Sequence, residues 1–132
     1  MFERPNTIML SGEQIPIKCD LIVLEKIQDK YESIANFEQL IYTFVPKLDE
    51  DGNFTKDEEG RIIGSVTTPA DLRPLTEALF WMVEEGCEIM RELGEDAPKY
   101  SETQIKRMVD MPPYQLSEVV HDEFLRAFER KN

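Results

Sequence analysis

The sequence predicts a mainly α protein of about five helices with a small N-terminal β-hairpin. Apolar residues recur every three to four positions over most of the chain, which is the period of a helix with one buried face. Helix-capping residues precede several of these stretches, and strand-like alternation is evident only near the start. With 132 residues the chain fits one domain, 1–132, and it shows no internal repeat.

The N-terminal stretch "TIMLSGEQIPIK" predicts two short strands that reverse at Ser11-Gly12. Pro16 lacks a backbone N–H, so the second strand must lie at a sheet edge or contain a bulge. We expect this hairpin to be a minor element beside the helices.

Two helices are expected next. Asp20 can cap a helix over Leu21–Tyr31, and Ser33 can cap a second over 34–45, until Pro46 ends it. The apolar face of the second helix then includes Phe44.

A long helix is predicted over 75–93 and ended by Gly94. Two adjacent apolar stripes cover about half of its circumference, so it should contact neighbours on two sides. The glycine at position 86 lies in one stripe and suggests either a close helix approach or a bend in the helix. Ser101 and Gln104 form a capping box that opens a short helix to about Val109, and a last helix is expected over 114–130.

The long helix also carries the candidate partner-binding residues. Trp81 falls on its acidic side, where an exposed tryptophan could anchor an interface. The other interpretation is that a loop or another helix covers it. Phe80 and Met90 join the candidate surface if the second stripe is not fully covered.

The acidic segment 47–66 is expected to be an exposed loop or a second hairpin, inserted between helices. Its stretch "KLDEDGNFTKDEEG" resembles a calcium-binding loop when Gly52 is set at the sixth position. The first ligand position would then be Lys47, whose ammonium group repels a cation, and Pro46 and Gly60 disfavour the flanking helices. We therefore predict no metal site, and a turn at Asp51-Gly52 or Asp51-Gly52-Asn53.

Composition excludes several classes of function. The net charge of −12 disfavours nucleic acid as a partner, and no apolar run is long enough to span a membrane. Cys19 and Cys87 lack metal or disulfide-framework spacing, and the start lacks the features of a signal peptide, so we expect free thiols and a cytoplasmic location.

No convergent catalytic set is evident, so we expect neither enzymatic activity nor a cofactor. His121 is the only histidine, and its helical neighbours Ser117 and Asp122 lack the strand-to-helix turn of a nucleophile. Paired acids such as Asp122-Glu123 are interpreted as a solvated face.

The order of segments resembles the tail assembly chaperones of long-tailed bacteriophages and prophages. The similarity rests on "IMLSGEQIPIKCDLIVLEKIQDKYESI", "LTEALFWMVEEGCEIMREL", "YSETQIKRMVD" and "EVVHDEFLRAFER", and spans nearly the whole chain. The acidic segment 47–66 looks like an insertion relative to compact members of that family.

The resemblance implies a non-enzymatic protein of the bacterial host cytoplasm that binds the tape measure protein and aids assembly of tail tube subunits around it. Self-association is a further expectation, from the two helix stripes. The alternative is an acidic regulatory module that occupies a basic groove on a partner; its binding would depend strongly on salt, whereas apolar burial would make chaperone binding more resistant.

Overall fold

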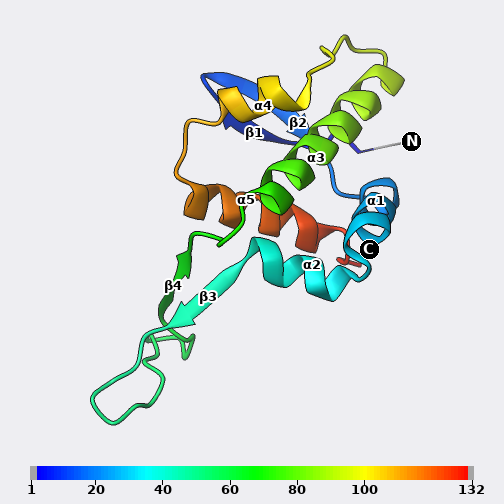
Figure 1. Cartoon of the computed structure of the whole chain (residues 1–132). Helices are drawn as coiled ribbons and strands as arrows, with labels where there is room; N and C mark the ends of the chain where they lie inside the picture. Colours follow the sequence, from blue (N-terminus) through cyan, green and yellow to red (C-terminus); the bar gives the residue numbers. More distant parts are fainter. Residues whose placement is uncertain (1–2, 131–132) are drawn as a thin grey trace.

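The computed structural model describes residues 3–130 and mixes helices with β-structure (Figure 1). In chain order the elements are β1 (Asn6–Leu10), β2 (Glu13–Ile17), α1 (Leu21–Tyr31), α2 (Ile34–Ile41), β3 (Thr43–Pro46), β4 (Gly64–Thr67), α3 (Arg73–Glu92), α4 (Glu102–Met108) and α5 (Pro113–Arg126). The strands form two antiparallel hairpins, β1-β2 and β3-β4. The prediction of a mainly α protein is therefore wrong: the described residues form a mixed α and β fold with two hairpins.

The β1-β2 hairpin is a full part of the core, which is why the fold is not mainly helical. Its inward side chains, Ile8, Leu10, Ile15 and Ile17, are all buried. Ser11 and Gly12 both have positive φ, as the tight turn between two paired strands requires. One face of this two-stranded sheet is thus covered, and the apolar alternation sets its register.

Helix α3 packs directly against β2. The backbone N–H of Lys18 donates to the carbonyl of Met82 at 3.0 Å, joining the end of the strand to the helix. A Cβ added to Gly86 would lie 2.6 Å from the carbonyl carbon of Pro16. The glycine does permit a close approach, but its neighbour is the backbone of a strand and not a helix.

The helix boundaries depart from the predicted ones at two places. Helix α2 ends at Ile41 instead of reaching Pro46, and Phe44 lies in β3. The run from Tyr42 to Val45 is aromatic or β-branched, and such residues favour a strand. Helix α5 also ends early, at Arg126.

Other helix ends follow the sequence. Asp20 accepts hydrogen bonds from the first turn of α1, and Ser101 and Gln104 form the capping box of α4. After α3, Gly94 has φ +88 and its N–H donates to Arg91, while the N–H of Glu95 donates to Met90. This pair of bonds satisfies the last carbonyls of the helix.

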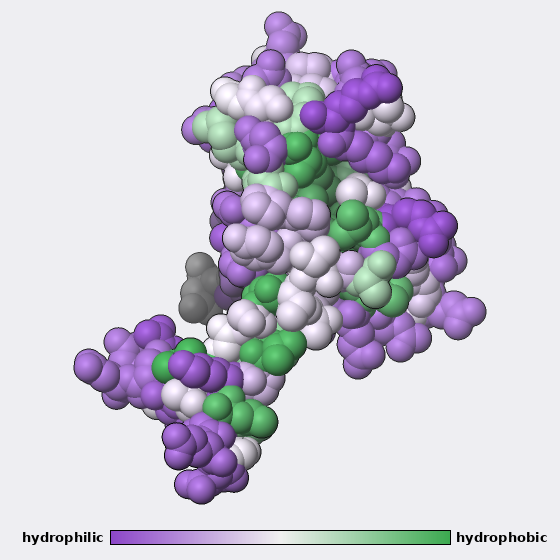
Figure 2. Space-filling model, turned by 60° about the vertical axis from the view of Figure 1, so that its left-hand side comes forward, coloured by the Kyte–Doolittle hydropathy of each residue, from purple (hydrophilic) through white to green (hydrophobic). Residues whose placement is uncertain are grey.

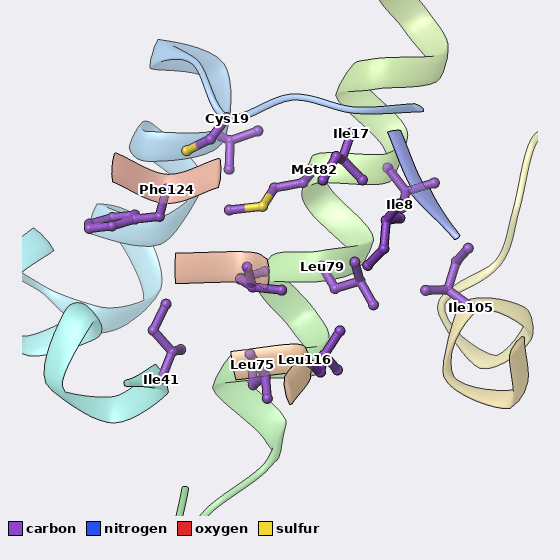
Figure 3. Close-up of a cluster of buried hydrophobic side chains, with 14 of the residues drawn as sticks. Ile8, Ile17, Cys19, Ile41, Leu75, Leu79, Met82, Ile105, Leu116 and Phe124 are labelled. Atoms are coloured by element: carbon purple, nitrogen blue, oxygen red, sulfur yellow. The ribbon is translucent and has the colours of Figure 1, made fainter. Parts of the chain in front are cut away.

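Side chains from both ends of the chain meet in one core (Figure 3). The figure labels Ile8, Ile17, Cys19, Ile41, Leu75, Leu79, Met82, Ile105, Leu116 and Phe124, which come from β1, β2, the loop before α1, and helices α2 to α5. The body is held together by apolar contacts between elements distant in sequence.

Candidate functional site: the arm and the surfaces beside it

Residues 43–67, which we call the arm, project from the body between α2 and α3 (Figure 1). The stem of the arm is the hairpin β3-β4, paired from Thr43↔Thr67 to Pro46↔Gly64. Residues 47–63 form its tip. The structure therefore places a hairpin where the sequence left either a loop or a hairpin.

Phe44 and Gly64 pack together within the stem. A Cβ on Gly64 would lie 2.6 Å from the Cζ atom of Phe44 and closer still to the carbonyl oxygen of Val45. The aromatic ring thus covers the glycine of the neighbouring strand. A larger residue at position 64 would displace the ring or the strand.

The tip consists of two successive eight-residue units, 48–55 and 56–63, that fold in the same way. Three backbone hydrogen bonds join them in a closed triangle: Lys47 donates to Ile63 at 2.8 Å, Ile63 to Thr55 at 2.8 Å, and Thr55 to Lys47 at 2.9 Å. The expectation that the chain contains no internal repeat is therefore wrong. The signal was the Asp-x-x-Gly spacing at 49–52 and again at 57–60.

An aspartate organises the turn of each unit. Oδ1 of Asp49 accepts from the N–H groups of Asp51 and Asn53, both at 2.9 Å. Oδ1 of Asp57 accepts from the equivalent pair, Glu59 and Arg61, also at 2.9 Å. Both turns contain a glycine with positive φ, at positions 52 and 60.

These bonds give the calcium-like pattern a structural role. The Asp49 carboxylate holds the backbone of its own turn, which lies between the bridged residues Leu48 and Phe54. Among residues 3–130, no three His, Cys, Asp or Glu side chains are grouped as a metal site would require.

Apolar side chains are unusually exposed along the arm (Figure 2). Six large ones keep between 39% and 55% of their surface accessible: Phe44, Val45, Leu48, Phe54, Ile62 and Ile63. Six acidic and three basic residues accompany them in the tip. The arm therefore combines apolar contact surface with net negative charge.

Trp81 lies on the acidic face of α3, beside two glutamates that form ion pairs with α1. Lys30 of α1 binds Glu77 at 2.5 Å, and Lys26 approaches Glu84 at 3.7 Å. Helical spacing puts Trp81 between these two glutamates. The tryptophan is half-buried and packs against the core, so it is neither fully exposed nor fully covered.

The two other candidate residues of α3 are also half-buried. Phe80 packs against the core, one turn before a groove of about 330 Å³. That groove runs between α3 and the segment 98–100, and is lined by Val83, Glu84, Cys87, Glu88, Arg91, Pro98, Lys99 and Tyr100. None of the three candidate residues lines this groove.

Polar groups of α5 that could suggest catalysis instead bind neighbouring elements. Ser117 donates to the carbonyl of Ile41, and Nε2 of His121 lies 2.7 Å from Oε2 of Glu38. Glu123 is only 1% exposed, so its assignment to a solvated face is wrong. The adjacent Asp122 is exposed, because successive helix positions point in different directions.

The Glu123 carboxylate ties the start of the chain to α5. It accepts from Nδ2 of Asn6 at 2.9 Å, from the backbone N–H of Cys19 at 3.2 Å and from Nη1 of Arg126 at 3.1 Å. A buried charge with three donors is satisfied rather than reactive.

The thiols are free and buried, as the sequence predicts. Burial raises the pKa of Cys19 to about 12, and the nearby Glu123 and Asp20 carboxylates add to the effect. Since the thiolate is the nucleophilic form, this thiol is unreactive at neutral pH.

Family models, curated proteins and solved structures yield no match to this chain. Helices α1 to α5 are all too short or too polar to cross a bilayer. The partner-binding roles of Trp81, Phe80 and Met90 stay predictions.

Proposed function

We propose that the protein is a non-enzymatic tail assembly chaperone that binds the tape measure protein and aids assembly of the tail tube, with the arm as its main contact. The resemblance of the sequence to tail assembly chaperones suggests the partner. The observation that carries the proposal is the exposed apolar surface of the arm.

The arm has a physical reason to bind another protein. A two-stranded hairpin is marginally stable by itself, and this one exposes side chains that hairpins in folded domains cover with a second layer. Burial of apolar surface contributes about 25 cal/mol per Å², so contact with an apolar partner stabilises both molecules. Exposed patches of this kind are typical of protein-binding surfaces.

Charge favours a partner that is basic as well as apolar. The tip carries −3 of the net −12, which leaves −9 for the rest of the chain. Two copies would therefore repel one another, whereas a basic helical surface would be attracted. The same charge also supports the alternative function, an acidic regulatory module that occupies a basic groove. In that case carboxylates, and not apolar groups, would make the main contacts.

Co-expression with the tape measure protein encoded nearby tests the proposal. We expect the chain to raise the soluble fraction of that protein and to co-elute with it at low and moderate salt. A variant in which Asn-Gly replaces residues 47–63 should lose both effects, because Pro46 and Gly64 are already paired and a two-residue turn can connect them.

Two matched pairs of tip substitutions separate the candidate functions. Leu48→Ser with Phe54→Ser removes apolar surface, and Glu50→Gln with Glu58→Gln removes two exposed charges whose side chains form no hydrogen bond or ion pair within residues 3–130. The chaperone proposal expects the first pair to weaken binding more than the second. Greater loss with the second pair, together with loss of binding in moderate salt, would favour the acidic module; a tape measure protein that stays insoluble in every case would overturn the proposal.

A further inference from the structure

A cleft of about 440 Å³ lies where the root of the arm meets α5. Three aromatic side chains, Tyr42, Phe44 and Tyr114, line it together with the carboxylates of Glu118 and Asp122. The remaining lining residues, Gly64, Ser65 and Val66, belong to β4 and contribute no charge. The cleft therefore joins aromatic surface to negative charge.

Two of the three aromatic side chains pack against neighbouring residues. The Tyr42 ring stacks on the His121 ring, with 3.8 Å between centroids and planes 10° apart. The ring of His121 is fixed in turn by Glu38. Phe44 is held against Gly64, as described above, so two walls of the cleft are preorganised.

The carboxylates come from one row on α5. Tyr114, Glu118 and Asp122 are spaced four residues apart and so share a helix face. Neither Glu118 nor Asp122 has an ion pair within residues 3–130, whereas Glu123 of the same helix is bound to Arg126. Burial, followed by the charges of Glu118 and Asp122, raises the pKa of Tyr42, which places both carboxylates near its hydroxyl.

We propose that this cleft binds an arginine side chain of a protein partner. A guanidinium group stacks on aromatic rings and donates to two carboxylates from one plane, whereas an ammonium group is a point charge without a flat face. The inference extends the proposed function by naming a side chain that the partner inserts beside the arm. Its test uses small molecules, so it can fail while the tape measure experiment succeeds, or the reverse.

The probe is N-acetylarginine amide, titrated into the isotopically labelled protein and followed by NMR. Its neutral isostere, N-acetylcitrulline amide, and N-acetyllysine amide are the comparison compounds. For the arginine compound we expect saturable chemical-shift changes confined to residues that line the cleft. The lysine compound should bind about threefold more weakly, and the citrulline compound should not bind.

Variants assign the binding to the cleft. Glu118→Gln with Asp122→Asn should weaken arginine binding about tenfold, and Tyr114→Leu about threefold, while Tyr114→Phe retains it. The matched control is Glu25→Gln with Asp29→Asn, an exposed acidic pair with the same spacing on α1, which should leave binding unchanged. Amide spectra away from the cleft confirm that each variant is folded.

Three results would overturn the inference. Shifts scattered over the acidic surface would show attraction without a site. Equal weakening by the α1 control pair would show that net charge decides. Equal binding of the lysine compound would remove the assignment to arginine.

Discussion

Gly86 of α3 lies so close to Pro16 of β2 that a Cβ at the glycine would be 2.6 Å from the proline's carbonyl carbon. The neighbouring atoms belong to a backbone, which cannot rotate away as a side chain can. Helix α3 and strand β2 can approach this closely because glycine has no Cβ.

Gly86→Ala should therefore destabilise the protein by up to about 2 kcal/mol. Overpacking of a core costs about 1–3 kcal/mol, against a gain of about 1 kcal/mol from the higher helix propensity of alanine. Urea denaturation measures the change in the free energy of unfolding. The sign of this change is the test, because a variant more stable than the wild type would show that helix and strand are not in close contact.

Removal of the Glu123 side chain should be more costly. Glu123→Ala leaves the buried N–H of Cys19 without its acceptor and takes a partner from Asn6 and Arg126, for a loss of about 3 kcal/mol. Glu123→Gln keeps one acceptor oxygen and should lose less. Glu129→Ala, an exposed site beyond the same helix, serves as control in thermal and urea unfolding; an equal small loss at both positions would contradict the role of the buried carboxylate.

Glu85 should make stability depend on pH near neutrality. Burial raises its pKa to about 8, with further contributions from its hydrogen bond to Asp20 and from the charges of Asp20 and Glu92. The folded state thus holds the proton more tightly than the unfolded one. This contribution to stability is fully present below about pH 4.5 and is lost as pH rises through about 8.

We expect Glu85→Gln to flatten that decline between pH 5 and 8. The free energy of unfolding, measured at several pH values, is the readout. Glu25→Gln removes an exposed charge from α1 and should leave the slope unchanged. A Glu85→Gln variant with the wild-type slope would mean that another group titrates.

Trp81→Ala should weaken binding of the proposed partner. The side chain is half-buried and packs against the core, so its removal also costs stability, and binding must be measured well below the unfolding temperature. Trp81→Phe keeps most of the packing and should retain most of the affinity. Undiminished binding by a folded Trp81→Ala variant would remove this residue from the interface.

The aspartates of the tip should act locally. Asp57→Ala removes the acceptor for the N–H groups of Glu59 and Arg61, so the amides of Thr55 and Ile63 should exchange with solvent faster. The core amides of α3 should keep their protection. Asp49→Ala tests the other unit, and unchanged exchange in both variants would show that the triangle of bonds persists without the aspartates.

Local signals in the sequence predict much of this fold. Asp20 and the Ser101–Gln104 pair locate the starts of α1 and α4, and Gly94 locates the end of α3, because capping needs only neighbouring residues. The end of α2 was missed because Phe44 fits a helical period as well as a strand. Only the pairing of β3 with β4 decides between them.

The candidate surfaces were less predictable. The glutamates beside Trp81 pair with lysines of α1 that are about 50 positions away in sequence, and Glu123 accepts a hydrogen bond from Asn6, 117 positions away. Such contacts have no signature in one sequence. The repeated unit of the tip did have one, in the two Asp-x-x-Gly segments eight residues apart.

The bonds of Glu123 also bear on synthesis of the chain. The N-terminal hairpin is made first, yet its attachment through Asn6 and the Cys19 backbone requires a carboxylate from α5. That helix leaves the ribosome after nearly all of the body has emerged. Until then the apolar face of β1 and β2 has only part of its cover, so the body cannot complete its packing before α5 is available.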